Sequence, residues 1–368
     1  MVDHSRTYDA ILFVSFGGPE GPDEVMPFLE RVTAGRGVPR DRLLLVAGHY
    51  SKRGGVSPIN QQNRDLIDAL RRELDAKGPK LPIYFGNRNW RPFLEDTMRR
   101  MADDGVKRAL AFVTSAYSSY SGCRQYREDI ARARAAVGSA APQVDKLRVF
   151  FNHPGFIEPM RDHVRAALQQ FPAERRDAVQ LAFTAHSIPL SMARTSRYVE
   201  QIEETCRLVA EPFPNPRVLV YQSRSGAPHV PWLEPDICDH LRQFAAEGSG
   251  VANGSDAERV TSGGGRDVVI VPIGFTSDHM EVAQDLDTQA RDVADSLGVN
   301  MVRAATAGTH ARFVSMIREL IVERMTPGAQ RAALGALGPS HDVCPDDCCP
   351  APVHAGRPAM AWRPHHKD

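Results

Sequence analysis

A histidine lies where a short apolar segment of the chain ends. His186 directly follows LAFTA (181–185), which has the length and side chains of a buried strand. Imidazole takes or gives protons near neutral pH, so a histidine at the carboxyl end of a strand is a candidate acid or base. The alternative is a histidine that only makes hydrogen bonds within its loop, and His186 alone does not decide between them.

A second group of titratable residues follows the apolar segment VVIVPIGF (268–275). Ser277 or Asp278 is expected to cap a helix there, and three polar residues four apart would share one face: Glu281, Asp285 and Gln289. Such carboxylates could pass protons or a hard cation along the helix, or could be a solvated acidic stripe near its N-terminus. If the strands are parallel, His186 and Glu281 lie at the same sheet edge and face one cleft.

Two segments of the first half combine aromatic, hydroxyl and cationic side chains. GHYSKRGGVSPIN (48–60) contains Tyr50, Lys52, Arg53 and Ser57, and TSAYSSYSGCRQYREDI (114–130) contains Tyr117, Tyr120 and Tyr126. This combination suits a flat apolar ligand with carboxylates at its edge, although each residue alone is compatible with ordinary loop chemistry. SFGGPEGPDEV (15–25) lacks the P-loop lysine and the G-x-G-x-x-G spacing, so nucleotide binding is not indicated.

Three of the six cysteines lie together near the C-terminus, in HDVCPDDCCPAP (341–352). They are Cys344, Cys348 and Cys349. The N-terminus has no basic segment followed by an apolar one, and no run approaches a membrane span, so we expect a cytoplasmic protein without an integral membrane segment. In a reducing compartment a cysteine cluster indicates a metal site or redox chemistry rather than structural disulfides.

Eight short apolar runs alternate with helix-length segments, which indicates parallel sheets covered on both faces. The runs are 10–16, 83–87, 109–115, 147–151, 179–185, 218–223, 268–275 and 299–305. The sequence predicts an α/β protein of two similar Rossmann-like, doubly wound domains, each with a four-stranded parallel sheet and with a ligand cleft between them. The expected domains are 7–150 and 151–326, with a flexible insertion at about 247–265 and a cysteine-bearing tail at 327–368.

The charge balance limits the class of partner. Lys and Arg together number 45, as do Asp and Glu, so no net charge would attract the protein to nucleic acid or to an anionic membrane. Any charged ligand must therefore be recognised locally.

Several motifs, in this order, are similar to those of the ferrochelatases, which insert ferrous iron into a porphyrin. They are SFGGPEGPDEV, GGVSPIN, TAHSIP, QSRSG followed by PWLEPD, and VPIGFTSDHMEVAQDLD. The resemblance spans most of the chain and implies two Rossmann-like domains around a porphyrin cleft. It also implies that His186 and Glu281 are the paired residues that bind the substrate iron and handle protons.

The resemblance implies further ligand contacts. It places Ser57 and Tyr126 against the porphyrin and its propionates, with Tyr50 nearby and Phe16 beside the macrocycle. Some relatives have an iron-binding tyrosine where this chain has Phe16, which cannot bind iron. The family's acidic ridge continues from Glu281 to Asp285, but its next member here is Gln289, which cannot ionise.

Some ferrochelatases carry a 2Fe-2S cluster held by three cysteines of a C-terminal extension and one of the body. The resemblance therefore implies a cluster bound by the three tail cysteines and Cys123, since such a cluster needs four thiolates. Cys206 and Cys238 are substitutes for the body ligand, and structural zinc is the alternative metal. The implied role is stabilising or redox-sensing.

The short N-terminus and the cysteine tail most resemble the actinobacterial form of the family, which implies coproporphyrin III as substrate. Protoporphyrin IX is the alternative substrate, and cobalt or nickel an alternative metal. A non-catalytic porphyrin or haem carrier or sensor is the alternative of another class. Neighbouring enzymes of haem biosynthesis are candidate partners.

Overall fold

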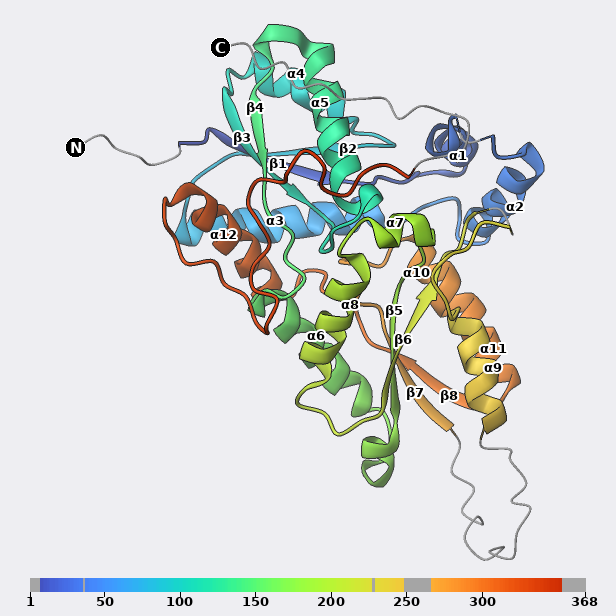
Figure 1. Ribbon diagram of the computed structural model, residues 1–368. Helices are drawn as coiled ribbons and strands as arrows, with labels where there is room; N and C mark the ends of the chain where they lie inside the picture. Colours follow the sequence, from blue (N-terminus) through green and yellow to red (C-terminus); the bar gives the residue numbers. More distant parts are fainter. Residues whose placement is uncertain (1–6, 36, 227–228, 248–265, 353–368) are drawn as a thin grey trace, which may run out of the picture.

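The chain forms two four-stranded sheets in which every strand pair is parallel (Figure 1). The computed structural model describes residues 7–35, 37–226, 229–247 and 266–352. The first sheet has the order β2-β1-β3-β4, with β1 (Ala10–Ser15), β2 (Ile83–Asn87), β3 (Arg108–Val113) and β4 (Gln143–Lys146). The second has the order β6-β5-β7-β8, with β5 (Gln180–His186), β6 (Arg217–Gln222), β7 (Arg266–Val271) and β8 (Val299–Arg303). The predicted α/β class and the division into four and four strands are confirmed.

The internal strands are largely apolar because helices cover both faces of each sheet. All six residues of β1, AILFVS, are buried, and so are most residues of the other internal strands β3, β5 and β7. Strands buried on both faces do not show the polar alternation of half-exposed strands. Phe13 lies in register with Phe85 and Phe112 on the two neighbouring strands.

The prediction of the fourth strand at 147–151 was wrong. The strand β4 is the polar segment Gln143–Lys146, which pairs with β3, whereas the apolar residues after it leave the sheet. Phe150 and Phe151 are 1% exposed and lie in the central core instead. An edge strand needs fewer apolar residues than a core segment, and hydrophobicity alone therefore pointed to the wrong segment.

The helices of the first half are α1 (Val25–Thr33), α2 (Arg40–Ser51), α3 (Ile59–Lys77), α4 (Leu94–Asp103) and α5 (Gln125–Val137). Those that follow are α6 (Pro154–Leu168), α7 (Leu190–Arg194), α8 (Tyr198–Ala210), α9 (Ile237–Glu247), α10 (Met280–Gln284), α11 (Arg291–Ser296) and α12 (Ala311–Met325). As the spacing predicts, α3 buries Leu66, Leu70 and Leu74 on one face. Two π-helical segments, Tyr120–Arg124 and Asp285–Ala290, interrupt this regular pattern.

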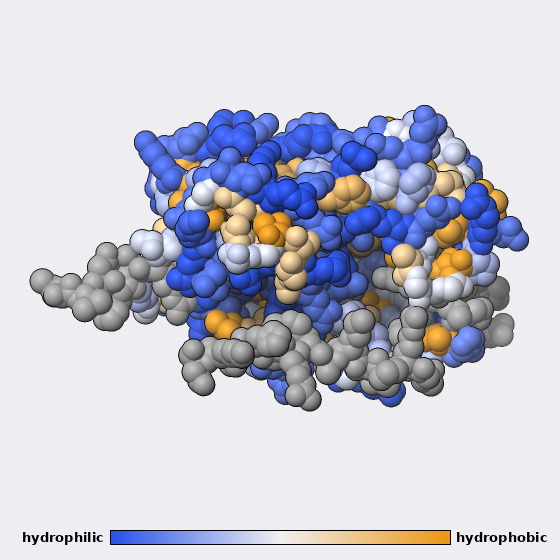
Figure 2. All heavy atoms as spheres, turned by 90° about the horizontal axis from the view of Figure 1, so that it is seen from above, coloured by the Kyte–Doolittle hydropathy of each residue, from blue (hydrophilic) through white to orange (hydrophobic). Residues whose placement is uncertain are grey.

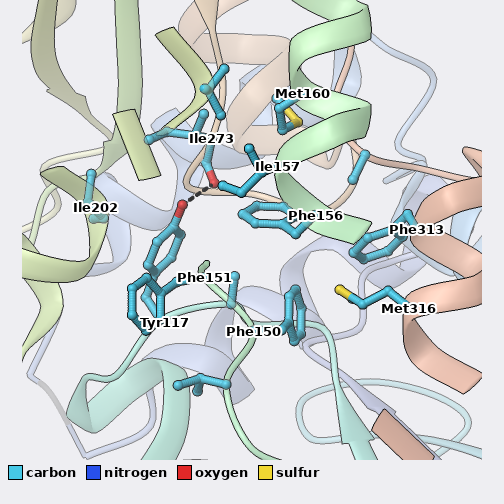
Figure 3. Close-up of a cluster of buried hydrophobic side chains, with 14 of the residues drawn as sticks. Tyr117, Phe150, Phe151, Phe156, Ile157, Met160, Ile202, Ile273, Phe313 and Met316 are labelled. Carbon is cyan, nitrogen blue, oxygen red and sulfur yellow. Dashed lines mark hydrogen bonds between the residues drawn. The ribbon is translucent and has the colours of Figure 1, made fainter. Parts of the chain in front are cut away.

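The largest hydrophobic cluster among the described residues takes side chains from both halves of the chain (Figure 3). Helix α12 follows the second sheet in sequence, yet it packs against both α3 and α6. Its Phe313 lies against Phe150 and Phe156, with ring centroids 5.8 and 6.1 Å apart. Tyr117, which follows β3, donates a buried hydrogen bond of 3.0 Å to the carbonyl of Ile273, which follows β7. The two sheets are therefore joined by a continuous core.

The tail after α12 lies along the body and passes close to the start of α5 (Figure 1). The Asn152 side chain donates hydrogen bonds to the carbonyls of Leu334 and Gly338, at 3.0 and 2.9 Å. Arg124 donates to the carbonyls of Asp346 and Cys348. Hydrogen bonds from the body therefore hold the tail in place independently of its cysteines.

The face seen from above is mostly hydrophilic, with scattered apolar residues (Figure 2). Among the described residues, none of the helices is long and apolar enough to cross a membrane. The predicted insertion at about 247–265 lies outside the described residues, apart from Glu247 at the end of α9. The predicted domain boundaries stay predictions.

Candidate active site and cysteine centre

His186 and Glu281 meet at the carboxyl edge of the second sheet. His186 is the last residue of β5, and Glu281 belongs to α10, which follows the neighbouring strand β7. The imidazole Nε2 lies 3.7 Å from the Glu281 carboxylate, and the two side chains are 30% and 51% exposed. The His186 Nδ1 is hydrogen-bonded to the carbonyl of Ser187, which fixes the ring with Nε2 toward the carboxylate. A charge pair that reaches solvent can exchange protons with a ligand.

Helix α10 begins one or two residues later than predicted. The N-cap is His279 rather than Ser277 or Asp278, and its Nδ1 accepts hydrogen bonds from the backbone N–H groups of Glu281 and Val282. The other ring nitrogen of His279 lies 4.0 Å from the Glu281 carboxylate. His279 is thus a second imidazole beside Glu281. Its position two residues before Glu281 in TSDHMEV could have predicted this from the sequence.

Asp285 lies next to the pair, at the start of a π-helical segment. The wider π turn departs from the four-residue alignment predicted for Glu281, Asp285 and Gln289, and Gln289 is exposed. Ser223, which follows β6 and has a φ of 63°, donates a hydrogen bond to the Asp285 carboxylate. The three adjacent strands β6, β5 and β7 are thus each followed or ended by a polar side chain of the same site.

The neighbouring charges give these groups different proton affinities. Burial alone would lower the pKa of His186, but Glu281 outweighs it and raises the pKa above its ordinary value. Burial would raise the pKa of Glu281, but the charges of His186 and His279 lower it. Burial, and then the Glu281 charge, raises the pKa of Asp285 to about 6 despite the hydrogen bond from Ser223. Glu281 therefore stays ionised at a pH at which Asp285 can take up a proton.

The predicted ligand contacts of the first half differ in how far their side chains are exposed to solvent. Phe16 is 37% exposed, whereas Tyr50, Ser57 and Tyr126 are buried. Burial, and then the Glu281 charge, raises the pKa of Tyr50, so α2 comes close to the second-half pair. Phe16 therefore offers an accessible aromatic surface, and the other three lie beneath the surface.

Arg88 links two of the predicted contacts and was missed in the sequence. Its guanidinium lies 4.6 Å from the centre of the Tyr126 ring and 5.8 Å from that of Phe16. It also forms a buried ion pair with Asp129, with an N–O distance of 2.7 Å. The signal is its position one residue after β2, at the same sheet edge as Phe16.

The tail cysteines converge with Cys123, which lies in the first π-helical segment and is buried. The neighbouring Cys344 thiol, together with burial, raises the pKa of Cys123. The sulfur atoms of Cys348 and Cys349 lie 3.6 Å apart, and Cys349 has a φ of 52°. This left-handed conformation is uncommon in a residue other than glycine.

A histidine also belongs to this cysteine centre. Ligand atoms of His341, Cys344 and Cys348 all lie within 4.8 Å of one another, so these residues could hold a metal ion. His341 precedes Cys344 by three residues, a short spacing from which a fifth donor could have been predicted. Cys206 and Cys238, the substitutes considered for the body ligand, are not in this group.

The family model described as Ferrochelatase matches residues 8–253 and 255–325. The chain belongs to the ferrochelatase family. The resemblance drawn from the sequence motifs is thereby confirmed. His186, Glu281 and Asp285 all lie within the part of the chain that matches the ferrochelatase model, whereas the three tail cysteines lie beyond it.

Named ferrochelatases match almost the whole chain. "Coproporphyrin III ferrochelatase" of Streptomyces coelicolor is 51% identical over 379 residues, which cover 96% of each chain. "Ferrochelatase" of Rhodopirellula baltica is 53% identical and covers 96% of this chain and 98% of its own. Among solved structures, "SirB from Bacillus subtilis with Fe3+" has a TM-score of 0.52 at 11% identity, and covers 86% of this chain and 97% of its own. This last likeness concerns the fold.

Proposed function

We propose that the protein inserts ferrous iron into coproporphyrin III to form iron coproporphyrin, a step of haem biosynthesis. The observation that carries the proposal is the pair of His186 and Glu281, 3.7 Å apart and open to solvent, in a chain of the ferrochelatase family. The substrate follows from the relatives, several of which are about half identical over 95% or more of this chain and are named for coproporphyrin III.

Insertion of each iron releases two protons from the porphyrin, and the site has one proton acceptor for each of them. His186 accepts the first pyrrole proton at Nε2, and the ionised Glu281 stabilises the resulting imidazolium. Asp285, with a pKa of about 6, accepts the second more readily than Glu281 does. Glu281 therefore remains a carboxylate that can bind the incoming iron.

The porphyrin lies against Phe16 in this proposal. A flat macrocycle gains free energy by covering exposed apolar surface, and Phe16 offers such surface at the carboxyl edge of the first sheet. In this proposal the buried side chains of Ser57, Tyr126 and Tyr50 contact the propionates. Arg88 packs on the Phe16 and Tyr126 rings and positions them, and its own charge is already paired with Asp129.

The test is His186→Ala, with iron insertion and porphyrin binding measured separately. We expect turnover to be nearly abolished while the porphyrin still binds. Loss of both would assign a structural role to His186, and unchanged turnover would refute its role as base. A wild-type protein that binds porphyrin without taking up iron would instead be a carrier or sensor.

Substrate choice needs its own comparison. Rates with coproporphyrin III and protoporphyrin IX should favour the former, because its additional propionates can pair with cations at the rim. Competition among iron, cobalt and nickel, added to the same preparation, then identifies the metal. A preference for protoporphyrin IX would contradict the substrate assignment and leave the chemistry of His186 and Glu281 intact.

We further propose that Cys123, Cys344, Cys348 and Cys349 hold a 2Fe-2S cluster. The four thiols come together from two distant parts of the chain, and the left-handed backbone at Cys349 is consistent with two adjacent ligands. When bound, the cluster would supply a redox-sensitive cross-link between tail and body. Iron insertion involves no net electron transfer, so its role is to stabilise the tail or to sense redox state.

The cluster is tested by absorption spectroscopy and by iron and sulfide content after anaerobic purification. Cys123→Ser should lose the visible bands, whereas Cys238→Ser, a matched control outside the group, should keep them. If His341→Ala loses the bands and Cys123→Ser keeps them, the histidine is the fourth ligand. A colourless protein with bound zinc would refute the iron–sulfur assignment.

A further inference from the structure

A cavity of about 250 Å³ lies between the tail and the first half of the chain. Its walls come from one face of α5, from β4 and the segment after it, from the end of α12, and from tail residues 340–344. Cys123 and Cys344 line it, but Cys348 and Cys349 do not. The cavity therefore adjoins the cysteine centre, with which it shares Cys123, His341 and Cys344, and lies apart from the His186 and Glu281 site.

The cavity is lined by more cations than anions. Six cationic side chains line it: Arg124, Arg127, Arg134, Lys146, Arg148 and Arg324. Only three carboxylates do so: Glu128, Asp145 and Asp342. Within the described residues, Glu128 pairs with Arg124, Asp145 with Arg108 and Arg324, and Asp342 with Arg324. Arg148 pairs with Glu323.

Three cations are left without a carboxylate partner among the described residues: Arg127, Arg134 and Lys146. Arg134 donates to the carbonyl of Pro142 and Lys146 to that of Leu147, so their charges are hydrogen-bonded without being neutralised. Arg127 keeps a buried Nη1 with no acceptor among the described residues. Arg148 and Arg324, which are 4% and 8% exposed, each keep one such nitrogen as well. Like charges held together in this way are stabilised when an anion binds among them.

We propose that this cavity binds a small dianion, such as a dicarboxylate or a phosphate ester. Guanidinium groups bind carboxylates and phosphates through paired N–H donors, and Ile130, Val144 and Leu147 supply an apolar wall for the carbon atoms between them. Arg127 and Arg134 are two turns apart on α5, about 10 Å along the helix axis, which matches an elongated ligand. A volume near 250 Å³ is below that of sites for drug-sized ligands.

Ligand binding would be linked to docking of the tail. Because residues 340–344 form one wall, the site is complete only when the tail lies against α5. A ligand that binds only the docked form stabilises that form by mass action. The dianion therefore acts as an effector that holds Cys344 beside Cys123, whatever the cysteines bind and whether or not the protein inserts iron.

The test uses the full chain with adipate and inorganic phosphate as separate probes, at constant ionic strength. We expect either probe to raise the melting temperature with saturation and to slow amide hydrogen exchange over 340–344. Ala131→Leu fills the cavity and should remove the effect, whereas Ala135→Leu, on an exposed position of the same helix, should not. Arg127→Gln should weaken binding roughly tenfold or more, the usual result of losing a charged hydrogen bond.

The probes and controls separate the outcomes. A response to adipate alone identifies a dicarboxylate site, and a response to phosphate alone identifies a phosphate site. Arg99→Gln, which removes an exposed arginine of α4, should leave binding unchanged. Stabilisation that follows total salt, or that is equal in all variants, would mean an adventitious ion only and would overturn the proposal, as would no stabilisation by either probe.

Discussion

Replacement of Glu281 by glutamine isolates the charge that sets the proton affinity of His186. The variant keeps the size and hydrogen-bonding oxygen of the side chain but removes its charge, 3.7 Å from the imidazole Nε2. Since Glu281 raises the pKa of His186 against the effect of burial, its loss should lower that pKa.

The distance and exposure give the size of the effect. At about 4 Å, two unit charges interact by about 1 kcal/mol in water and about 4 kcal/mol at an effective dielectric constant of 20. Glu281 is half exposed, so solvent screening favours the lower figure. A change of about 1 kcal/mol corresponds to a roughly fivefold weaker proton affinity of His186.

The assay is an NMR titration of the His186 ring in the wild-type protein, in Glu281→Gln and in Glu30→Gln, an exposed control on α1. The titration of His186 should move to lower pH in Glu281→Gln only, and the acid limb of the pH profile of iron insertion should move with it. An unchanged or higher His186 pKa would refute the electrostatic argument. Because the folded state favours the protonated ring, this stabilisation is complete below the ordinary histidine pKa and is lost as pH rises through the raised one.

Three further substitutions test the packing around the site. Gly18→Ala places a methyl group 2.6 Å from the Ser57 side chain and should weaken porphyrin binding in a fluorescence titration, whereas Gly21→Ala, with open space around it, should not. Tyr117→Phe removes a buried hydrogen bond between the two halves and should lower the free energy of unfolding, measured in urea, by about 1 kcal/mol. No change would mean that water can replace the bond. Phe156→Ala should cost about 3–5 kcal/mol by the same measurement, and a loss below about 1 kcal/mol would mean that the core is not packed as described.

The meeting of His186 and Glu281 could be predicted from the sequence because parallel topology decides it. Both residues follow buried strands, and adjacent parallel strands present their carboxyl ends at one edge. The alternation of strands and helices could also be predicted, since the internal strands had to be apolar to be covered on both faces, whereas the polar edge strand β4 was missed. The roles of these residues came from the motifs, because position alone fits many chemistries.

Other features depend on packing that the sequence does not display. Nothing in YSGCR or DLDTQA indicates a π turn, which adds one residue to a helical turn and changes which side chains align. Tyr117 reads like a ligand-binding loop residue, yet it is buried between the sheets because the core has a place for its ring and an acceptor for its hydroxyl. His279 was overlooked because capping is usually performed by shorter side chains, which are also present just before it.

The shared core also bears on how a rigid macrocycle could enter and leave the protein. To swing apart, the two sheets would have to separate the rings of Phe150, Phe156 and Phe313 and expose them to water. That cost favours exchange by local rearrangement of surface segments such as α2, which contributes few buried side chains and no residue to this core. We expect relaxation measurements to find millisecond motion in α2 and little in the sheets. The two sheets and their shared core would then stay rigid while α2 moves, so that a bound porphyrin must adopt the shape that the rigid part of the protein imposes.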